Sequence, residues 1–567
     1  MNATPATSPV MGTASTMGDV EQLTTTRLIR DAARTYRDQE IVHRTLAGEW
    51  KVTDYATSWG RTQRVAAGLA AQGIGPGDRV GLLLWNDLRH FECYFAVPLT
   101  GATMVQLNLR LAPQDLAYVI RHSGARTLIV DATLLPLAEG LAPHLPEGTR
   151  WIVASDGDLP EAWAGRADAV SYEDLVAGHE PIEDAPDMDE RSASGACYTT
   201  GTTGRPKGVY YSHRSTWLHS FAVAASTGMT MDDTVMLLTP MFHAQCWGLP
   251  YAAVAVGARI VLPGRFTLQD TPLLTDALVE HGVTLAPAAP AILLPMLHHL
   301  EQMAQTPHLP GLRFLCGASE PPVALMQGFD RLMGAEIIHA YGATETSPIV
   351  SVNRLRPALK AGLTEDEQWD LKRYQGLVVT GVDVKIVDPL GQPLPPGEQN
   401  VGEIRVRGPW VTSSYGDDPE ATEKGFDDEG YWRSGDVGYL SEDGYLKVSD
   451  RMKDVIKSGG EWISTIDLEN HMLTVPGVSE AAVVGVPHPK WQERPLALAV
   501  RAPGADVTED QVKDALRARF ASWQVPDRVL FVDELDRTSV GKLDKKRLRQ
   551  AYADALAEGD GPSAPQG

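Results

Sequence analysis

The residues best suited to chemistry in this chain lie in the stretch 198–209, which reads YTTGTTGRPKGV. Threonine hydroxyls donate to phosphate oxygens, glycines let the backbone approach a ligand closely, and Arg205 and Lys207 supply positive charge. This combination predicts a loop that holds a polyphosphate, whereas the alternative is an ordinary Gly/Thr/Pro turn without a ligand. The residues predicted to hold phosphate are Thr199, Thr200, Gly201, Thr202, Thr203, Gly204 and Lys207.

The loop does not have the spacing of a Walker P-loop. That motif needs Gly-Lys-Ser/Thr after four intervening residues, with a helix to follow. Here Pro206 stands where the second glycine is required, and Lys207 is followed by Gly208. The sequence therefore predicts a different way of binding a nucleoside triphosphate.

The composition is that of an ordinary globular protein with several domains. The chain has 567 residues, of which 43% are hydrophobic and 22% charged. It carries 50 Lys and Arg against 73 Asp and Glu, a formal net charge of −23. An acidic surface argues against nucleic acid or an anionic membrane as the main partner, so an anionic substrate must meet a local cluster of cations.

Four scattered cysteines, at 93, 197, 246 and 316, lie in apolar contexts and form neither ligand spacing nor a disulfide framework. They predict buried thiols and a reducing, cytoplasmic location. No apolar run approaches the ~20 residues that span a bilayer. The Ser/Thr-rich segment 1–20 and the Gly/Pro/Ser-rich segment 557–567 predict disordered tails.

The elements that must position the loop alternate as strand and helix from about 28 to 350. A faint repeat supports two related sheets. In it Asp78 and Gly101 parallel Asp233 and Gly257, with a helix expected to end in Val-Pro or Leu-Pro before each glycine. We therefore expect an α/β fold with two related sheets packed together. The predicted strands are 80–84, 103–107, 127–130, 235–238, 259–262 and 313–316.

The pattern changes after about residue 376, where short segments broken by Gly and Pro predict a small antiparallel barrel or meander. The charged segment 449–464 is predicted to be a linker, and a capping box at 508–511 opens a helix in a small α+β unit beyond it. The expected domains are 21–450, a hinge at 451–456, and a mobile C-terminal lid at 457–556. The predicted strands are 383–387, 402–407, 445–448, 481–486, 496–500 and 528–532.

Five further motifs follow the loop in order: CGAS at 316–319, YGATET at 341–346, YWRSGDVGY at 431–439, SDRMKDVIKSGGEWIS at 449–464 and TSVGKLDKK at 538–546. With the loop, they resemble the acyl-adenylate-forming superfamily of acyl-CoA synthetases, luciferases and peptide-synthetase adenylation domains, over nearly the whole chain. KSGGEWIS, PHPKWQERPLA at 487–497 and FHAQCWGLPY at 242–251 look most like medium- and long-chain fatty acyl-CoA synthetases.

The resemblance implies a two-step reaction that uses ATP, Mg²⁺ and coenzyme A. A carboxylate attacks the α-phosphate to give acyl-AMP and pyrophosphate, and the CoA thiol then displaces AMP from the acyl carbon. Such catalysis is mainly positioning and cationic stabilisation. The implied catalytic residues are Lys542 bridging carboxylate and phosphate, Thr344 on the α-phosphate, Glu345 with Thr200 on the metal, and His243 beside the carboxylate.

The resemblance also assigns the residues that bind nucleotide, CoA and acid. Without it, the same segments could be a capped strand end, a Ser-Gly-Asp turn, an interdomain turn, a core tryptophan and a solvated lysine. The implied adenine and ribose residues are Gly317, Ala318, Ser319, His339, Ala340, Tyr341, Gly342, Asp436 and Arg451. The implied hinge is Lys453, the CoA channel has Lys457, Gly459, Gly460 and Trp462, and the acyl pocket has His243, Trp247 and Ala288.

The chain departs from this family pattern near the expected acyl pocket. Ala-Gln-Cys at 244–246 stands where relatives carry Val-Asn-Ala, and Ala-Ala-Pro at 288–290 stands where they carry Gly-Val-Pro. Glu320 replaces a small apolar residue, and we expect it to favour the N-terminal end of a helix beginning at Pro321. The length and polarity of the acid therefore stay open.

Other functions share parts of this pattern. A short-chain, thioether or aryl acid could replace the fatty acid. A luciferase-like oxygenase, a ligase that loads a carrier protein, and a degenerate nucleotide-binding scaffold are the rival classes. The resemblance also makes a homodimer plausible, because near relatives can pair through N-terminal segments.

Overall fold

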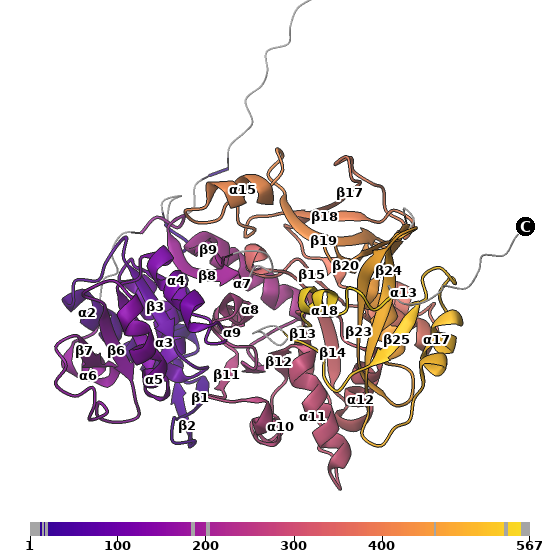
Figure 1. The fold of residues 1–567 in the computed structure, drawn as a ribbon. Coiled ribbons are helices and arrows are strands. Elements are labelled where there is room, and N and C mark those ends of the chain that lie inside the picture. Colours follow the sequence, from indigo (N-terminus) through magenta and orange to yellow (C-terminus); the bar gives the residue numbers. More distant parts are fainter. Residues whose placement is uncertain are drawn as a thin grey trace, which may run out of the picture.

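Two sheets with a shared layer of helices form the larger part of the molecule, and a small α+β domain follows them (Figure 1). The computed structural model describes residues 12–13, 16, 21–182, 188–199, 205–458, 461–537 and 543–556, and not the side chains of 268, 461 and 462. The expected α/β architecture is confirmed.

The first sheet has seven strands in the order β7-β6-β5-β3-β4-β8-β9. Its pairs are parallel except β8 with β9, an antiparallel pair that carries the predicted phosphate loop between its strands. The strands are β3 (Arg79–Leu83), β4 (Thr103–Gln106), β5 (Thr127–Asp131), β6 (Arg150–Ala154), β7 (Ala169–Ser171), β8 (Ala193–Thr199) and β9 (Lys207–Ser212).

The second sheet continues edge to edge into the antiparallel meander, so the two form one path of thirteen strands. Its first half is parallel apart from the edge strand β2, and the pairs from β14 through β15 onward are antiparallel. The first half has β2 (Trp50–Asp54), β1 (Glu40–Arg44), β11 (Arg259–Leu262), β10 (Thr234–Met236), β12 (Leu285–Ala288), β13 (Arg313–Cys316) and β14 (Glu336–Tyr341). The meander has β15 (Ser351–Val352), β16 (Gly376–Val378), β20 (Tyr445–Arg451), β19 (Trp432–Leu440), β18 (Gly402–Arg407) and β17 (Asp383–Val387).

Helices cover both faces of the two sheets. The largest core cluster lies between the sheets and joins side chains of α1, α3 and α9 to inward-facing residues of β3 and β11. Two further clusters bury the outer face of each sheet, under α4 and α5 in one case and under α10, α11 and α12 in the other. These helices are α1 (Thr25–Thr35), α2 (Tyr55–Ala71), α3 (Leu88–Leu99), α4 (Pro113–Ser123), α5 (Leu135–Leu141), α6 (Tyr172–Gly178), α7 (His213–Thr227), α8 (Ala244–Trp247), α9 (Leu249–Val256), α10 (Thr271–Glu280), α11 (Pro290–Gln302) and α12 (Val323–Met333). The meander adds α13 (Pro357–Lys360), α14 (Glu365–Lys372) and α15 (Pro419–Gly425).

The repeat seen in the sequence corresponds to matching strand–helix–strand units, β3-α3-β4 and β10-α9-β11. In both units a glycine leaves the helix at positive φ, 83° at Gly101 and 73° at Gly257, where other residues are strained. The expected helix end at Leu-Pro is wrong, because Leu249 and Pro250 open α9. Proline suits this first turn, whose backbone N–H groups have no helical acceptor.

The C-terminal domain pairs β21 (Ile456–Ser458), β22 (Glu461–Ile463), β23 (Val478–His488), β24 (Gln492–Arg501) and β25 (Arg528–Phe531) with α16 (Thr465–Met472), α17 (Glu509–Arg517) and α18 (Lys545–Ala551). The linker expected over 449–464 is wrong for much of its length, because β20 extends to Arg451 and the β21–β22 hairpin follows. The capping box is confirmed, with Thr508 and Gln511 bonded reciprocally at the start of α17.

All four cysteine side chains are buried free thiols, as predicted. Within the described ranges, no helix combines the length and the apolar character needed to cross a bilayer.

Candidate active site

A cavity of about 2750 Å³ opens between the two sheets, the meander and the C-terminal domain, and it receives most of the predicted site residues. These come from the end of β8 and the start of β9, from the ends of β13 and β14, and from β19 and β20. The predicted residues that line it are Thr199, Lys207, His243, Trp247, Gly317, Ala318, Ser319, His339, Ala340, Tyr341, Gly342, Thr344, Glu345, Asp436, Arg451 and Lys453.

Two predicted residues lie away from this cavity. Ala288 is fully buried in β12, and the next residue, Ala289, lines the cavity in its place. Lys457 is exposed on β21. The remaining predictions fall outside the described residues, namely Thr200, Gly201, Thr202, Thr203, Gly204, Gly459, Gly460 and Lys542, together with the side chain of Trp462.

The ends of β13 and β14 bring two predicted adenine segments together. The strands are parallel with Cys316 opposite His339, so residues 317–319, which follow β13, lie beside residues 340–342 at the end of β14. At Gly342 a Cβ atom would lie 1.2 Å from the carbonyl oxygen of Pro348, so only glycine fits. The His339 Nδ1 lies 2.8 Å from the carbonyl oxygen of Arg373, and burial lowers the pKa of His339 to about 4.

Asp436 presents an oriented carboxylate to the cavity. β19 and β20 pair Asp436 with Arg451, whose Nε lies 2.7 Å from Oδ1. The hydroxyl of Tyr341 donates to Oδ2 at 2.5 Å. Burial and the neighbouring Asp436 charge raise the pKa of Tyr341 well above its usual value, so the phenol keeps its proton. One charged and one neutral donor therefore fix the carboxylate.

Glu345 is the second oriented carboxylate. The Tyr415 hydroxyl donates to its Oε1 at 2.7 Å, and the Lys207 ammonium lies 4.7 Å from the centre of the same ring. Burial raises the pKa of Glu345, partly offset by the bond from Tyr415. Sequence reasoning missed Tyr415, which lies in a loop after β18 and belongs to none of the recognised motifs.

The donor set fits a hard cation that shares its ligands with phosphate. Among the residues that the structure describes, no three His, Cys, Asp or Glu side chains converge as a metal site. Mg²⁺ uses one or two protein carboxylates and fills its other positions with phosphate oxygens and water. Glu345, a buried carboxylate near Lys207, fits that requirement and does not fit an all-protein metal centre.

The acyl side of the cavity contains an unusual left-handed turn. Ala244, Gln245, Cys246 and Trp247 have φ of 44°, 53°, 51° and 57°, a conformation that non-glycine residues adopt rarely and seldom in succession. The turn leaves His243 and Trp247 on the cavity wall. The indole lies against Gly317, where a Cβ atom would be 3.1 Å from the ring.

Glu320 does not act as we expected. α12 begins after Pro322, and the Glu320 carboxylate is bonded instead to Arg373 and Lys447 at 2.7 and 2.6 Å. Both cations come from elements distant in sequence, so the chain gave no local signal for this arrangement.

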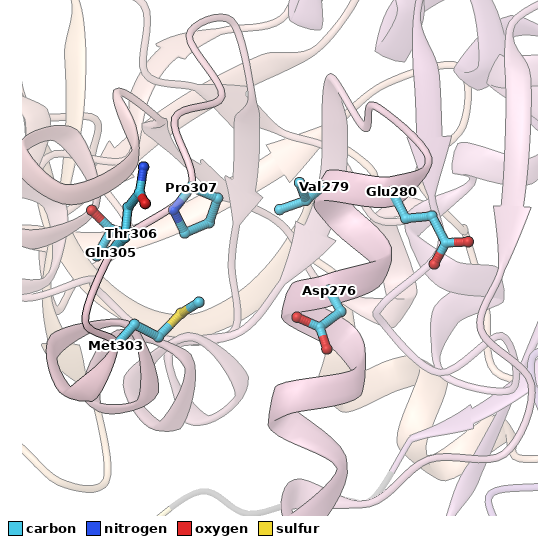
Figure 2. Close-up of a pocket in the computed structure, with 7 residues that line it drawn as sticks. All are labelled: Asp276, Val279, Glu280, Met303, Gln305, Thr306 and Pro307. Atoms are coloured by element: carbon cyan, nitrogen blue, oxygen red, sulfur yellow. The ribbon is translucent and has the colours of Figure 1, made fainter.

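A second hollow, of about 370 Å³, lies between α10 and the segment after α11 (Figure 2). Asp276, Val279 and Glu280 face it from α10, and Met303 and residues 305–307 face it from the other side. It contains none of the predicted site residues.

The sequence matches the AMP-binding enzyme family over residues 29–416 and the AMP-binding enzyme C-terminal domain over residues 467–542. The chain therefore belongs to the AMP-binding enzyme family. It is an AMP-forming acid–thiol ligase, a class that uses ATP, Mg²⁺ and CoA.

Relatives with assigned substrates match nearly the whole chain. A long-chain-fatty-acid–CoA ligase of Thermus thermophilus is 41% identical, covering 95% of this chain and 97% of its own. A 3-methylmercaptopropionyl-CoA ligase of Ruegeria pomeroyi is 39% identical, covering 93% and 97%. The crystal structure of ATP-bound MatB from Rhodopseudomonas palustris superposes with a TM-score of 0.78 at 26% identity, covering 94% and 99%.

Proposed function

We propose that this enzyme joins a medium- or long-chain fatty acid to CoA through an acyl-adenylate. The observation that carries the proposal is the shared cavity, where the oriented carboxylates of Asp436 and Glu345 meet Lys207 and residues 543–546 of the C-terminal domain. The similarity to the Thermus thermophilus ligase supports a fatty acid as the substrate.

In the first half-reaction, the adenine lies between residues 317–319 and Tyr341, and Asp436 accepts both ribose hydroxyls with Arg451 beside it. The phosphate loop and Lys207 hold the polyphosphate, and Thr344 donates to the α-phosphate. Glu345 and Thr200 would hold Mg²⁺, which when bound neutralises charge on the phosphate oxygens. Lys542 bridges the substrate carboxylate and the α-phosphate as the carboxylate oxygen attacks phosphorus and pyrophosphate leaves.

In the second half-reaction, the C-terminal domain turns about a hinge at 451–456, with Lys453 as the pivot. Residues 543–546 line the cavity while Lys457 is exposed, an arrangement that suits adenylation. Rotation would withdraw Lys542 and bring Lys457, Gly459, Gly460 and Trp462 to the CoA channel. The thiolate then attacks the acyl carbon, and AMP leaves with the electron pair of the broken C–O bond.

The further assignments are a cytoplasmic location and a homodimer formed through N-terminal segments.

A thioether acid is the second candidate substrate, because the Ruegeria pomeroyi relative is nearly as similar as the fatty acid ligase. A panel that contains fatty acids of six to eighteen carbons and 3-methylmercaptopropionate distinguishes these substrates by the mass of the CoA thioester. If only the thioether acid gives a product, the fatty acid assignment is wrong.

The mechanism is tested by Lys542→Ala in the two half-reactions measured separately. We expect acid-dependent pyrophosphate release to be lost, because no other group bridges carboxylate and phosphate. Thioester formation from supplied acyl-AMP should continue near the wild-type rate. The matched control is Arg517→Ala, which removes an exposed cation of the same domain that does not line the cavity and should leave both rates unchanged.

Equal loss of both half-reactions in Lys542→Ala would contradict the rotation of the C-terminal domain. Three further assays address the rival functions. Light emission with luciferin would indicate an oxygenase, and transfer to a phosphopantetheinyl carrier protein in preference to CoA would indicate a carrier-loading ligase. Absence of pyrophosphate release with every acid would indicate a degenerate scaffold.

A further inference from the structure

The Glu320 carboxylate lies where the nucleotide cavity meets the boundary between the two domains. Its side chain is only 2% exposed, and it is bonded to Arg373 at the end of α14 and to Lys447 on β20. Burial alone would raise its pKa, but the two cations outweigh burial and hold the pKa below its usual value. Glu320 is therefore a buried anion that the large domain already neutralises.

The small domain adds two side chains to this group, Asp467 and Asn470, through one face of α16. Asn470 Nδ2 donates to Glu320 Oε1 at 2.8 Å, and Asp467 Oδ1 lies 3.4 Å from Arg373 Nη2 and 3.9 Å from Lys447 Nζ. Asp467 and Asn470 are three residues apart, so both reach the same surface. In the large domain, Arg373 and Lys447 together with Glu320 leave one net positive charge. In the small domain, Asp467 supplies one negative charge.

We propose that these five residues, Glu320, Arg373, Lys447, Asp467 and Asn470, form a clamp that holds the small domain in the adenylating position. The inference rests on the proposed function, because it requires two positions of the small domain. Glu320 acts as a positioning residue, because it follows the predicted adenine segment 317–319 directly and ties that segment to α16.

The composition of the clamp makes it releasable in every catalytic cycle. When α16 moves away, Glu320 keeps both cations, so no buried charge is left unpaired. Only the hydrogen bond from Asn470 to Glu320 and the contacts of Asp467 with the two cations are broken. Water can replace these partners at the freed surface. A clamp whose buried ion pairs crossed the boundary would resist rotation far more.

Asn470→Asp tests the clamp by putting a carboxylate at hydrogen-bond distance from Glu320. We expect the rate of acid-dependent pyrophosphate release to fall at least about tenfold, within the range of typical coupling between sites. Thioester formation from supplied acyl-AMP should be unchanged or faster. Asn470→Ala, which removes the bond without adding charge, should give a smaller loss of the same kind. The control is Arg519→Ala, which removes an exposed interdomain pair with Asp370 and should change neither rate.

A readout that needs no substrate measures the position of the small domain. Spin labels on Val52→Cys and Asp510→Cys, exposed residues of the two domains, can be attached selectively because the four native cysteines are buried. In Asn470→Asp, part of the molecules should move from the label-to-label distance of the wild type to a second distance. Arg519→Ala should leave the distance distribution unchanged. An unchanged distance distribution together with unchanged half-reaction rates overturns the clamp. A protein that adenylates no acid would refute the proposed function, yet the labels would still report on the clamp.

Discussion

The two cavity carboxylates assigned to the ribose and to the cation are each oriented by a tyrosine hydroxyl, Asp436 by Tyr341 and Glu345 by Tyr415. A neutral phenol fixes the direction of a carboxylate without cancelling its charge, whereas a second salt bridge would compete with the ligand. The phenols therefore orient these carboxylates toward the ribose hydroxyls and a cation without adding a positive charge beside them.

At this scale we predict that Asp436→Asn raises the KM for ATP about tenfold to a hundredfold. The change removes a charged acceptor of two hydroxyl hydrogen bonds, and a bond to a charged group is worth about 1.5–3 kcal/mol. The KM for the acid should change little. Steady-state kinetics of pyrophosphate release measure both constants. An unchanged KM for ATP would refute the ribose assignment, and Tyr341→Phe should give a smaller rise because it leaves the carboxylate in place.

The left-handed turn at 244–247 is the element that most directly shapes the acyl side of the cavity. Four successive non-glycine residues at positive φ each cost about 1–2 kcal/mol relative to the right-handed conformation. The surrounding core holds them there, with Cys246 Sγ donating to the carbonyl oxygen of Thr239 at 3.1 Å. The strain keeps the Trp247 side chain on the cavity wall.

The strain predicts different effects of glycine at two buried alanines. In Ala244→Gly the relief of positive φ offsets the lost methyl group, so we expect little change in the free energy of unfolding. Ala252→Gly in the right-handed helix α9 has no such relief and should cost about 1 kcal/mol or more. Thermal unfolding of the two variants makes the comparison. Equal destabilisation by both changes would show that the turn is not strained.

The elements also show what could be predicted from the sequence. The apolar runs at 259–262 and 313–316 became strands with the expected bounds, because continuous burial leaves a clear pattern. The β21–β22 hairpin was missed, since its strands are three residues long and lie in a charged, glycine-bearing segment. The sequence motifs identified most of the cavity residues, whereas Tyr415 and the partners of Glu320 depend on contacts between distant segments.

On the scale of the whole molecule, His219 lies where the helices between the sheets meet the meander. Its Nε2 accepts the backbone N–H of Ile349 at 3.3 Å, and its ring packs against Trp410. Burial lowers its pKa to about 3, so the folded protein keeps the imidazole neutral. Protonation would remove the acceptor and place a charge in the core.

This pKa shift predicts a pH dependence of stability. Above the pKa of the unfolded state, about 6.5, the His219 imidazole is neutral in both the folded and the unfolded protein, and its contribution to the free energy of unfolding is complete. As the pH falls below 6.5, only the unfolded state takes up the proton, so stability is lost progressively until about pH 3. In urea unfolding, the free energy of unfolding of His219→Gln should therefore fall by about 1 kcal/mol less than that of wild type between pH 7.5 and pH 5.5. The exposed control His298→Gln should show the same dependence on pH as the wild type. Identical slopes of the free energy of unfolding against pH in all three proteins would contradict the role given to His219.

Isotope transfer from the acid to AMP shows whether the acid attacks the α-phosphate of ATP. The fatty acid that gives most product in the panel is supplied with ¹⁸O in both carboxylate oxygens, and the products are analysed by mass. We expect one ¹⁸O in AMP, one in the acyl-CoA carbonyl and none in pyrophosphate. Unlabelled AMP, or label in phosphate with ADP as the nucleotide product, would contradict attack at the α-phosphate.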